Sequence, residues 1–148
     1  MNRTLVIAGL AIIHAVASAA PGADESFSTL AARYLDGIAD RSPVAATALG
    51  DHRADDRLDD VDAAARARIR DTFLDYRETL AGIDRDELSR ANQVDAAILH
   101  NEIESSLFEL DTLEEWAWNP LYYVRLSGNA IYGLLSRDFA PLDERLDN

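Results

Sequence analysis

The sequence predicts an all-α fold in which several amphipathic helices pack as an irregular bundle and form the N-terminal portion of a larger helical fold. Three observations favour this class. Apolar residues recur at spacings of three and four through most of the chain, which places them on one face of a helix. Residues typical of helix starts and stops flank those segments. No run alternates apolar and polar residues between turn formers, so we expect no strands.

The first predicted helix spans about 25–40. Its apolar stripe runs from Phe27 to Ile38 at helical spacing, with charged residues between. Asp24 or Ser26 is expected to cap its start, because a side-chain oxygen there can accept a free backbone N–H.

A short second helix is predicted within 42–50. Ser42 is placed as the N-cap, Pro43 at the first helical position and Gly50 just past the end. These preferences arise from a free oxygen acceptor, a preset φ and tolerance of positive φ, respectively.

Two long helices are predicted at about 63–81 and 90–116. In the first, apolar residues are spaced 4, 3, 4 and 3 apart, which is typical of a seam packed against another helix. Ser89 is the expected N-cap of the second. The seam consists of Ile69, Phe73, Tyr76, Leu80 and Ile83, and the apolar face of the second helix includes Val94, Ile98, Leu99, Ile103, Leu107, Phe108, Leu110 and Leu113.

The segment after Trp116 predicts shorter elements. Pro120 disfavours helical backbone at Asn119, and a short helix is expected at about 129–136. Pro141 then opens another helix, with acidic residues in its first turn. Because barely two turns of that helix precede the last residue, we expect the chain to be the front part of a longer protein.

The first 19 residues resemble a secretory signal peptide. Arg3 supplies the positive charge, 5–16 form an apolar core, and Ala17-Ser18-Ala19 matches a small-x-small cleavage site. The expected mature region is 20–148, exported to the periplasm or secreted, with no membrane association after cleavage. An uncleaved membrane anchor is the alternative.

Composition narrows the function classes. The chain has 27 acidic and 14 basic residues, a formal net charge of −13, and no cysteine. Such an acidic chain is a poor partner for nucleic acid or for an anionic membrane surface. The absence of cysteine excludes disulfides, a thiolate nucleophile and cysteine-ligated zinc.

No catalytic or metal-ligating residue can be assigned from motifs. The sequence lacks His-Glu-x-x-His and Gly-x-Ser-x-Gly. His100 and Glu104 share a helix face, but catalytic zinc needs three protein ligands. The acidic stretch 51–62 lacks the ligand order of a calcium loop. We expect it to be a solvated loop in which Arg53 and Arg57 pair with neighbouring acids.

The most site-like feature is an aromatic stretch at 116–123, which holds both tryptophans and two of the five tyrosines. Such side chains combine an apolar body with a polar tip and often line clefts. We therefore name Trp118, Asn119, Tyr122 and Tyr123 as candidate substrate-binding residues. The alternative is that these aromatic rings wedge helices together at a corner.

Several stretches, in order, resemble a bacterial family called domain of unknown function 885 (DUF885). They are SPVAATALGDHR (42–53), DRLDD (56–60), ANQVDA (91–96), SLFEL (106–110), WAWNPLYY (116–123) and DFAPL (138–142). The resemblance covers nearly all of the mature region.

This resemblance implies a larger, mainly helical, exported protein similar to zinc metallopeptidases of the thermolysin-like group. Zinc and a His-Glu helix are implied for the C-terminal half of full-length members, and a peptide is the implied substrate. No catalytic residue carries over to this chain. We therefore expect an N-terminal helical segment that is inactive alone and whose partner is the missing C-terminal part of the same fold. The rival hypotheses are a stand-alone periplasmic helical binding module and an acidic metal-binding module.

Overall fold

The computed structural model describes residues 22–147, and every regular element in that range is helical. The predicted leader at 1–19 lies outside the described residues. The α-helices are α1 (Ala23–Asp36), α2 (Ile38–Arg41), α3 (Pro43–Leu49), α4 (Ala63–Ala81), α5 (Arg90–Phe108), α6 (Glu115–Trp118), α7 (Pro120–Ser136) and α8 (Leu142–Leu146). A 3₁₀ turn, η1 (Arg85–Glu87), and a π-helical turn, η2 (Glu109–Leu113), complete the set. The predicted all-α class is confirmed.

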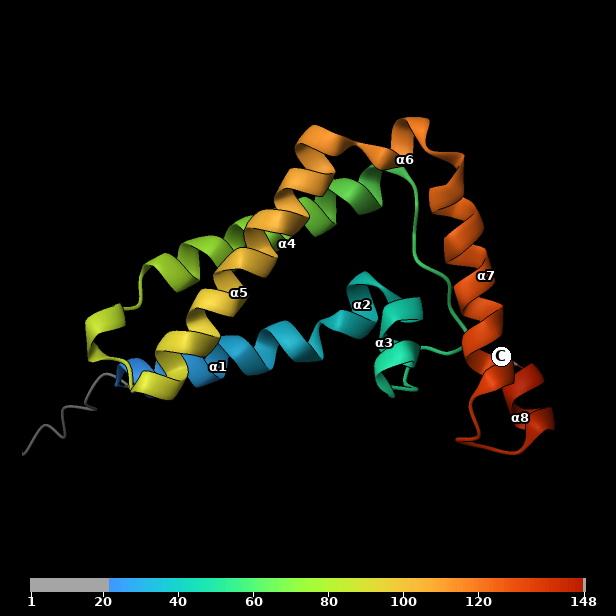
Figure 1. Ribbon diagram of the computed structural model, residues 1–148, viewed down its shortest axis with the longest axis horizontal. Coiled ribbons are helices and arrows are strands. Elements are labelled where there is room, and N and C mark those ends of the chain that lie inside the picture. Colours follow the sequence, from blue (N-terminus) through green and yellow to red (C-terminus); the bar gives the residue numbers. More distant parts are fainter. Residues whose placement is uncertain (1–21, 148) are drawn as a thin grey trace, which may run out of the picture.

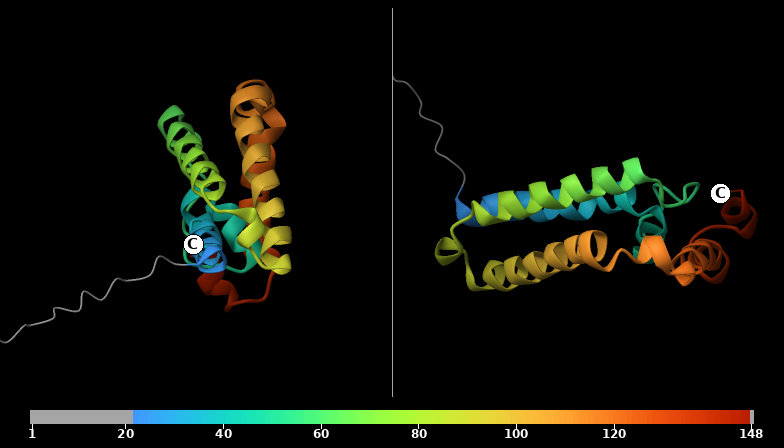
Figure 2. Two further views of the ribbon diagram at one scale, coloured as in Figure 1. Left: turned by 90° about the vertical axis from the view of Figure 1, so that its left-hand side faces the viewer. Right: turned by 90° about the horizontal axis from the view of Figure 1, so that it is seen from above.

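The helices form an arch with two limbs (Figure 1). The thicker limb contains α1, α4 and α5, which pack against one another. From the upper end of α5 the chain turns through η2 and α6, and α7 descends as the second limb. The arch closes at its base, where α3 packs against α7. The view from above shows α4 lying over α1, with α5 alongside them (Figure 2).

The main hydrophobic core lies in the thicker limb. It joins residues from α1, α4, α5 and the turn before α5. The predicted seam contributes three buried residues and two half-buried ones, of which Ile83 lies just after the end of α4. The buried members are Phe27, Leu30, Phe73, Tyr76, Leu80, Leu88, Ala96, Leu99, Ile103 and Leu107. A smaller cluster of Ala39, Ala46 and Ala54 lies at the base of the arch. None of the described helices is both long and apolar enough to cross a bilayer.

Several predicted caps are confirmed. Ser42 Oγ accepts the N–H of Ala45, Ser89 Oγ accepts the N–H of Asn92, and Gly50 ends α3 with φ of +92°. A left-handed residue at a helix end favours glycine, which has no Cβ to clash. These contacts fix where α3 and α5 begin and where α3 ends.

The predicted cap of the first helix is wrong. Gly22 occupies the N-cap position of α1 and makes no side-chain cap. Asp24 Oδ1 instead accepts the N–H of Ser89 at 2.9 Å and the Nδ2–H of Asn92 at 2.7 Å. The carboxylate therefore joins the start of α1 to the start of α5. Gly37 then divides the predicted single helix into α1 and α2.

The predicted end of the long helix at Trp116 is also wrong. Regular α-helix stops at Phe108, a π-turn follows, and Glu114 adopts a left-handed conformation with φ of +47°. Two indole N–H groups bond to carbonyls that the broken helix leaves free: Trp116 Nε1 donates to Leu110 O at 3.4 Å and Trp118 Nε1 donates to Leu113 O at 2.8 Å. The chain can turn here because the tryptophans satisfy these carbonyls.

The next helix is longer than predicted. It begins at Pro120 rather than near 129, since Asn119 is extended and its Oδ1 accepts the N–H of Leu121 at 3.1 Å. At its other end the buried guanidinium of Arg145, in α8, donates to the carbonyls of Leu134 and Arg137. An arginine side chain thus supplies the C-terminal cap of α7 and holds α8 against it.

Candidate functional site

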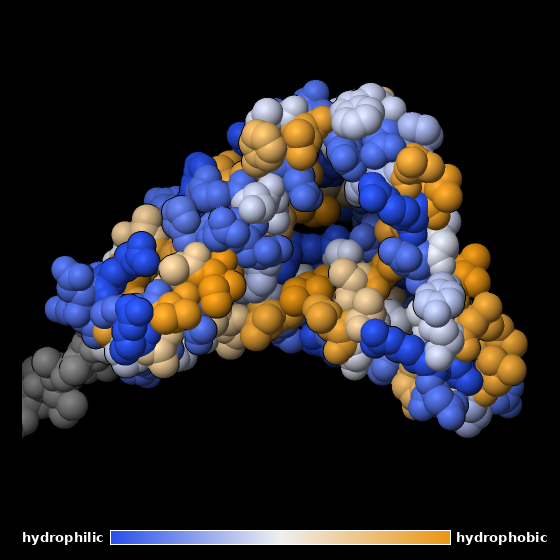
Figure 3. Space-filling view, viewed as in Figure 1, coloured by the Kyte–Doolittle hydropathy of each residue, from blue (hydrophilic) through white to orange (hydrophobic). Residues whose placement is uncertain are grey.

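A hollow of about 890 Å³ lies between the two limbs of the arch. In the space-filling view it is visible below α4 and α5 and beside α7, with polar and apolar side chains at its rim (Figure 3). Its lining comes from α1 to α7 and from the loop after α3. The residues that carry its chemistry are Tyr34, Arg41, Asp59, Arg66, Glu102, Glu109, Glu115, Trp116, Tyr122 and Arg125.

Arg41 forms the floor of the hollow at the end of α2. Its guanidinium carbon lies 4.8 Å from the ring centre of Tyr34 and 5.4 Å from that of Tyr76. Nη1 donates to the Tyr76 hydroxyl at 3.1 Å and Nη2 donates to the Tyr34 carbonyl at 3.0 Å. The absence of a side chain at Gly37 makes room for this arrangement, because a Cβ there would lie 2.6 Å from Arg41 Nη1. Arg41 is therefore held rigidly against the core.

A second arginine closes the upper corner. The guanidinium carbon of Arg66, from α4, lies 3.9 Å from the ring centre of Trp116, from α6. A cation stacked on an indole face is attracted by the ring quadrupole. Arg125, from α7, reaches the same corner, with its Nη2 3.4 Å from Glu115 Oε2. The corner therefore joins three helices through cationic and aromatic groups.

Two phenols with raised pKa values also line the hollow. Burial is the main cause for both Tyr34 and Tyr122. The nearby carboxylates of Glu102 and Asp59, respectively, raise the two pKa values further. Both phenols therefore stay neutral at physiological pH and can donate a hydrogen bond to a ligand. Asp59 is itself fixed, since its carboxylate accepts from Ser42 Oγ at 2.6 Å and from the Val44 N–H at 3.0 Å.

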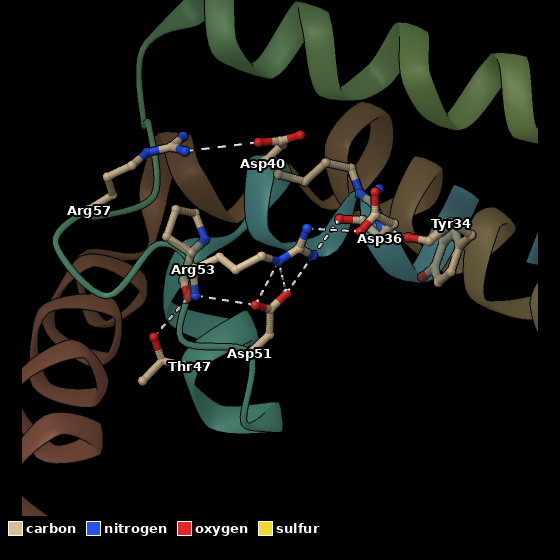
Figure 4. A network of polar contacts seen from close by, with 9 residues as sticks. Tyr34, Asp36, Asp40, Thr47, Asp51, Arg53 and Arg57 are labelled. Atoms are coloured by element: carbon tan, nitrogen blue, oxygen red, sulfur yellow. Dashed lines mark hydrogen bonds and ion pairs between the residues drawn. The ribbon is translucent and has the colours of Figure 1, made fainter. Parts of the chain in front are cut away.

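The acidic loop between α3 and α4 is joined to its surroundings by arginines, as predicted. Arg53 pairs with Asp51 at 2.7 Å and with Asp36 at 2.9 Å, and Arg57 lies 3.9 Å from Asp40 (Figure 4). The Arg53 guanidinium lowers the pKa of the Asp51 carboxyl by hydrogen bonding. These ion pairs hold the loop against α1 and α2.

The same loop is also held against the C-terminal segment. The side chain of Asp55, which is almost fully buried, accepts from Thr47 Oγ1 at 2.6 Å and lies 2.8 Å from His52 Nδ1. The His52 ring stacks on Phe139 with centres 3.7 Å apart. The expectation of a purely solvated loop is therefore incomplete, because part of it is packed.

The four residues named from the sequence lie at the corner of the arch, and only Tyr122 lines the hollow. Trp118 is exposed and caps η2. Asn119 caps α7 and donates to Glu115. Tyr123 donates its hydroxyl to the Trp116 carbonyl at 2.7 Å. Substrate binding by these four residues stays a prediction.

No sequence pattern indicated that three arginines would line the hollow. Arg41, Arg66 and Arg125 are far apart along the chain and fit no short motif. Trp116, two positions from a named residue, is the indole that faces the hollow. The aromatic stretch was therefore the one sequence feature that pointed to the hollow. It correctly indicated the corner of the arch, but only one of the four residues named from it lines the hollow.

Within 22–147 no three His, Asp or Glu side chains are grouped so that they could hold a metal ion. Glu104, considered beside His100, instead faces Arg77 at 3.8 Å. The zinc implied by the family resemblance therefore finds no ligand set in this part of the chain.

The fold and the hollow define an all-helical protein with a charged and aromatic interior surface. A family model described as a bacterial protein of unknown function (DUF885) matches residues 43–148, well over half of the chain. The chain belongs to this family. Searches of curated proteins and of solved structures found no match.

Proposed function

We propose that the chain is the N-terminal helical segment of an exported, zinc-dependent peptidase-like protein, and that the hollow is one wall of the channel that binds the peptide substrate. The observation that carries this proposal is the hollow itself. It combines cationic, anionic and aromatic side chains from elements far apart in sequence. A peptide presents charged ends, backbone donors and acceptors, and apolar side chains, and such a lining complements all of them.

The chemistry is assigned to a further part of the same fold, which would pack across the open side of the hollow and bring the zinc ligands. Zinc, when bound there, would polarise the scissile carbonyl and activate water. The role of the present chain is to bind and orient substrate. Rigid groups such as Arg41, already bonded to Tyr34 and Tyr76, suit that role because they need no rearrangement on binding. We expect the chain alone to bind peptides without cleaving them.

The test uses the two tryptophans. Trp116 lines the hollow and Trp118 is 64% exposed outside it. Titration of the unaltered protein with a tryptophan-free hexapeptide of mixed charge should change the indole emission saturably. A Trp118→Phe variant whose circular dichroism matches that of the unaltered protein should keep this change, because its remaining indole lines the hollow. The matched Trp116→Phe variant keeps only the outer indole and should give no such change.

Two results would overturn the proposal. Zinc-dependent cleavage of peptides by purified 20–148 would show that the chain needs no further part. An indole emission that does not change with any hexapeptide, whatever its charge and hydrophobicity, would contradict the assignment of the hollow as a wall of the peptide channel. The export component is tested separately by N-terminal sequencing of the secreted protein, which should begin at Ala20.

A second candidate, a stand-alone periplasmic binding module, is favoured by one observation. The described helices and the loop after α3 surround the hollow apart from its open side, and α3 packs against α7 at its base. Such a module needs no second part to form its site. Sequencing of the gene beyond codon 148 separates the two hypotheses, since a downstream His-Glu helix in frame favours the peptidase segment.

A further inference from the structure

Two arginines of the hollow are half-buried and have no acidic partner. Among the arginines of residues 22–147 only Arg41 and Arg66 are half-buried, and neither makes an ion pair within that range. Both line the hollow. The third arginine there, Arg125, is exposed and pairs with Glu115. A guanidinium that has lost part of its hydration is usually compensated by an acidic group, so the hollow has room for an anionic partner.

Arg41 is held in place and still has donors to offer. A guanidinium carries five N–H donors. Arg41 uses one on the Tyr76 hydroxyl and one on the Tyr34 carbonyl, and it makes no other hydrogen bond within the described part of the chain. Two of the five donors are therefore used, which leaves three for a ligand. The planar fork of a guanidinium matches the two oxygens of a carboxylate.

The floor around Arg41 also offers apolar cover. The ring centre of Phe73 lies 5.5 Å from the Arg41 guanidinium carbon. Phe73 lines the hollow together with Ile38 and Ile69. A charge-assisted hydrogen bond is stronger where apolar neighbours lower the local dielectric. The floor therefore suits a peptide residue that carries a carboxylate next to apolar groups.

The other half-buried arginine is less available to an anion. The Arg66 guanidinium is stacked on Trp116. It also shares its surroundings with acids, as the pKa of Tyr122 records. Burial is the main cause of that raised pKa; the carboxylates of Asp59 and Glu109 raise it further, and Arg66 opposes them. The floor of the hollow is therefore the better site for a carboxylate than this corner.

We propose that Arg41 binds a carboxylate of the peptide, which is either the C-terminal carboxylate or the side chain of an acidic residue. The carboxylate oxygens accept the N–H donors of Arg41 that the protein leaves free. This inference rests on the proposed function, because it names the chemical group of the peptide that the hollow selects.

Four acetylated, tryptophan-free hexapeptides of one sequence test the proposal. They carry glutamate or glutamine at one internal position and end in a carboxylate or an amide. Dissociation constants come from the indole emission of the unaltered protein. The peptides that carry the selected carboxylate should bind at least about 10-fold more tightly than the peptide with neither carboxylate. Amidation or the change to glutamine, whichever removes this preference, identifies the source of the carboxylate.

The sign of the preference excludes a non-specific charge effect. The formal net charge of the chain is −13, so the overall field repels an anionic peptide and favours the neutral one. Tighter binding of the carboxylate peptide therefore requires a local cation.

Three variants assign the preference to Arg41. Arg41→Gln should make the carboxylate and neutral peptides bind alike. Arg85→Gln is the charge-matched control and should keep the preference: Arg85 is exposed on η1, outside the hollow, and has no ion pair within the described residues. Because Arg41 also packs on the core, Glu102→Gln tests the site without loss of that packing. Glu102 is exposed on α5 and lines the hollow, and removal of its negative charge should increase the preference.

The outcomes separate this inference from the proposal on which it rests. Equal binding of all four peptides would overturn the inference and leave peptide binding intact, whereas no change in emission with any peptide would overturn both. The assignment would also be overturned by a preference that survives Arg41→Gln, that is lost in Arg66→Gln instead, or that does not rise in Glu102→Gln.

Discussion

Gly37 and Gly82 form a natural pair for testing how the floor of the hollow is built. Each follows the end of a long helix, and their backbone conformations are almost the same, with φ of −77° and −76°. Alanine can adopt both conformations. Replacing glycine with alanine lowers the conformational entropy of the unfolded chain, which should stabilise the protein by about 0.4–1 kcal/mol. The difference that matters for the packing is what a Cβ would touch at each site.

At Gly82 the nearest atom to a Cβ is the Thr79 carbonyl oxygen at 3.4 Å, an ordinary contact. At Gly37 a Cβ would lie 2.6 Å from Arg41 Nη1, 3.0 Å from the Tyr76 hydroxyl and 3.2 Å from the Arg33 carbonyl oxygen. Overpacking of this kind costs about 1–3 kcal/mol, which exceeds the entropic gain. We therefore expect Gly82→Ala to stabilise the fold slightly and Gly37→Ala to destabilise it by about 1–2 kcal/mol.

Urea unfolding followed by circular dichroism measures both changes. With an m-value of about 2 kcal/mol/M, the midpoint of Gly37→Ala should fall by about 0.5–1 M. In an Arg41→Ala background the same substitution should cost less, because one of the three close contacts is gone. Equal midpoint shifts for the two glycine variants, or an unchanged cost without the arginine, would refute the reasoning.

Three further predictions concern the thicker limb. Ile103 is 1% exposed at its centre, so Ile103→Ala should cost about 2–5 kcal/mol in a denaturant titration because it leaves a cavity. Ser89→Ala should lower stability by about 1 kcal/mol through loss of the α5 cap, and an unchanged midpoint would reject that role. The N–H of Ser89 and the amide of Asn92 lower the pKa of Asp24 below its usual 3.8 in the folded state. That stabilisation is complete above pH 3.8 and is lost as pH falls through the lowered pKa, so Asp24→Asn should reduce the acid sensitivity of unfolding.

The helices that the sequence located well are those whose signals are local. Ser42, Gly50 and Ser89 act on backbone groups within a few residues, and the α4 seam needs only a neighbouring helix. The end of α5 was missed because apolar periodicity continues through Leu110 and Leu113 after the helix has broken. The break depends on a left-handed glutamate, a residue with no special preference for that conformation, and on indoles that return to cap the turn.

The candidate site was only partly predictable for a related reason. A hollow between two limbs depends on contacts between elements that are far apart in sequence. The periodicity within one helix does not show which other elements that helix will contact. The aromatic stretch indicated the corner because tryptophan and tyrosine need both apolar cover and a polar partner. The arginines gave no comparable signal, since a lone arginine on an amphipathic helix is usually solvated.

The base of the arch has a mechanical consequence. There α3 meets α7, in which no residue is buried, and the three-alanine cluster beside the contact includes no residue of α7, whereas α1, α4 and α5 share aromatic and aliphatic packing. Parting this seam would turn a closed ring into an open hook while the larger packed unit stays whole. The amide hydrogens of α7 should then exchange well before those of α4 and α5. A ligand could therefore enter through this seam without global unfolding.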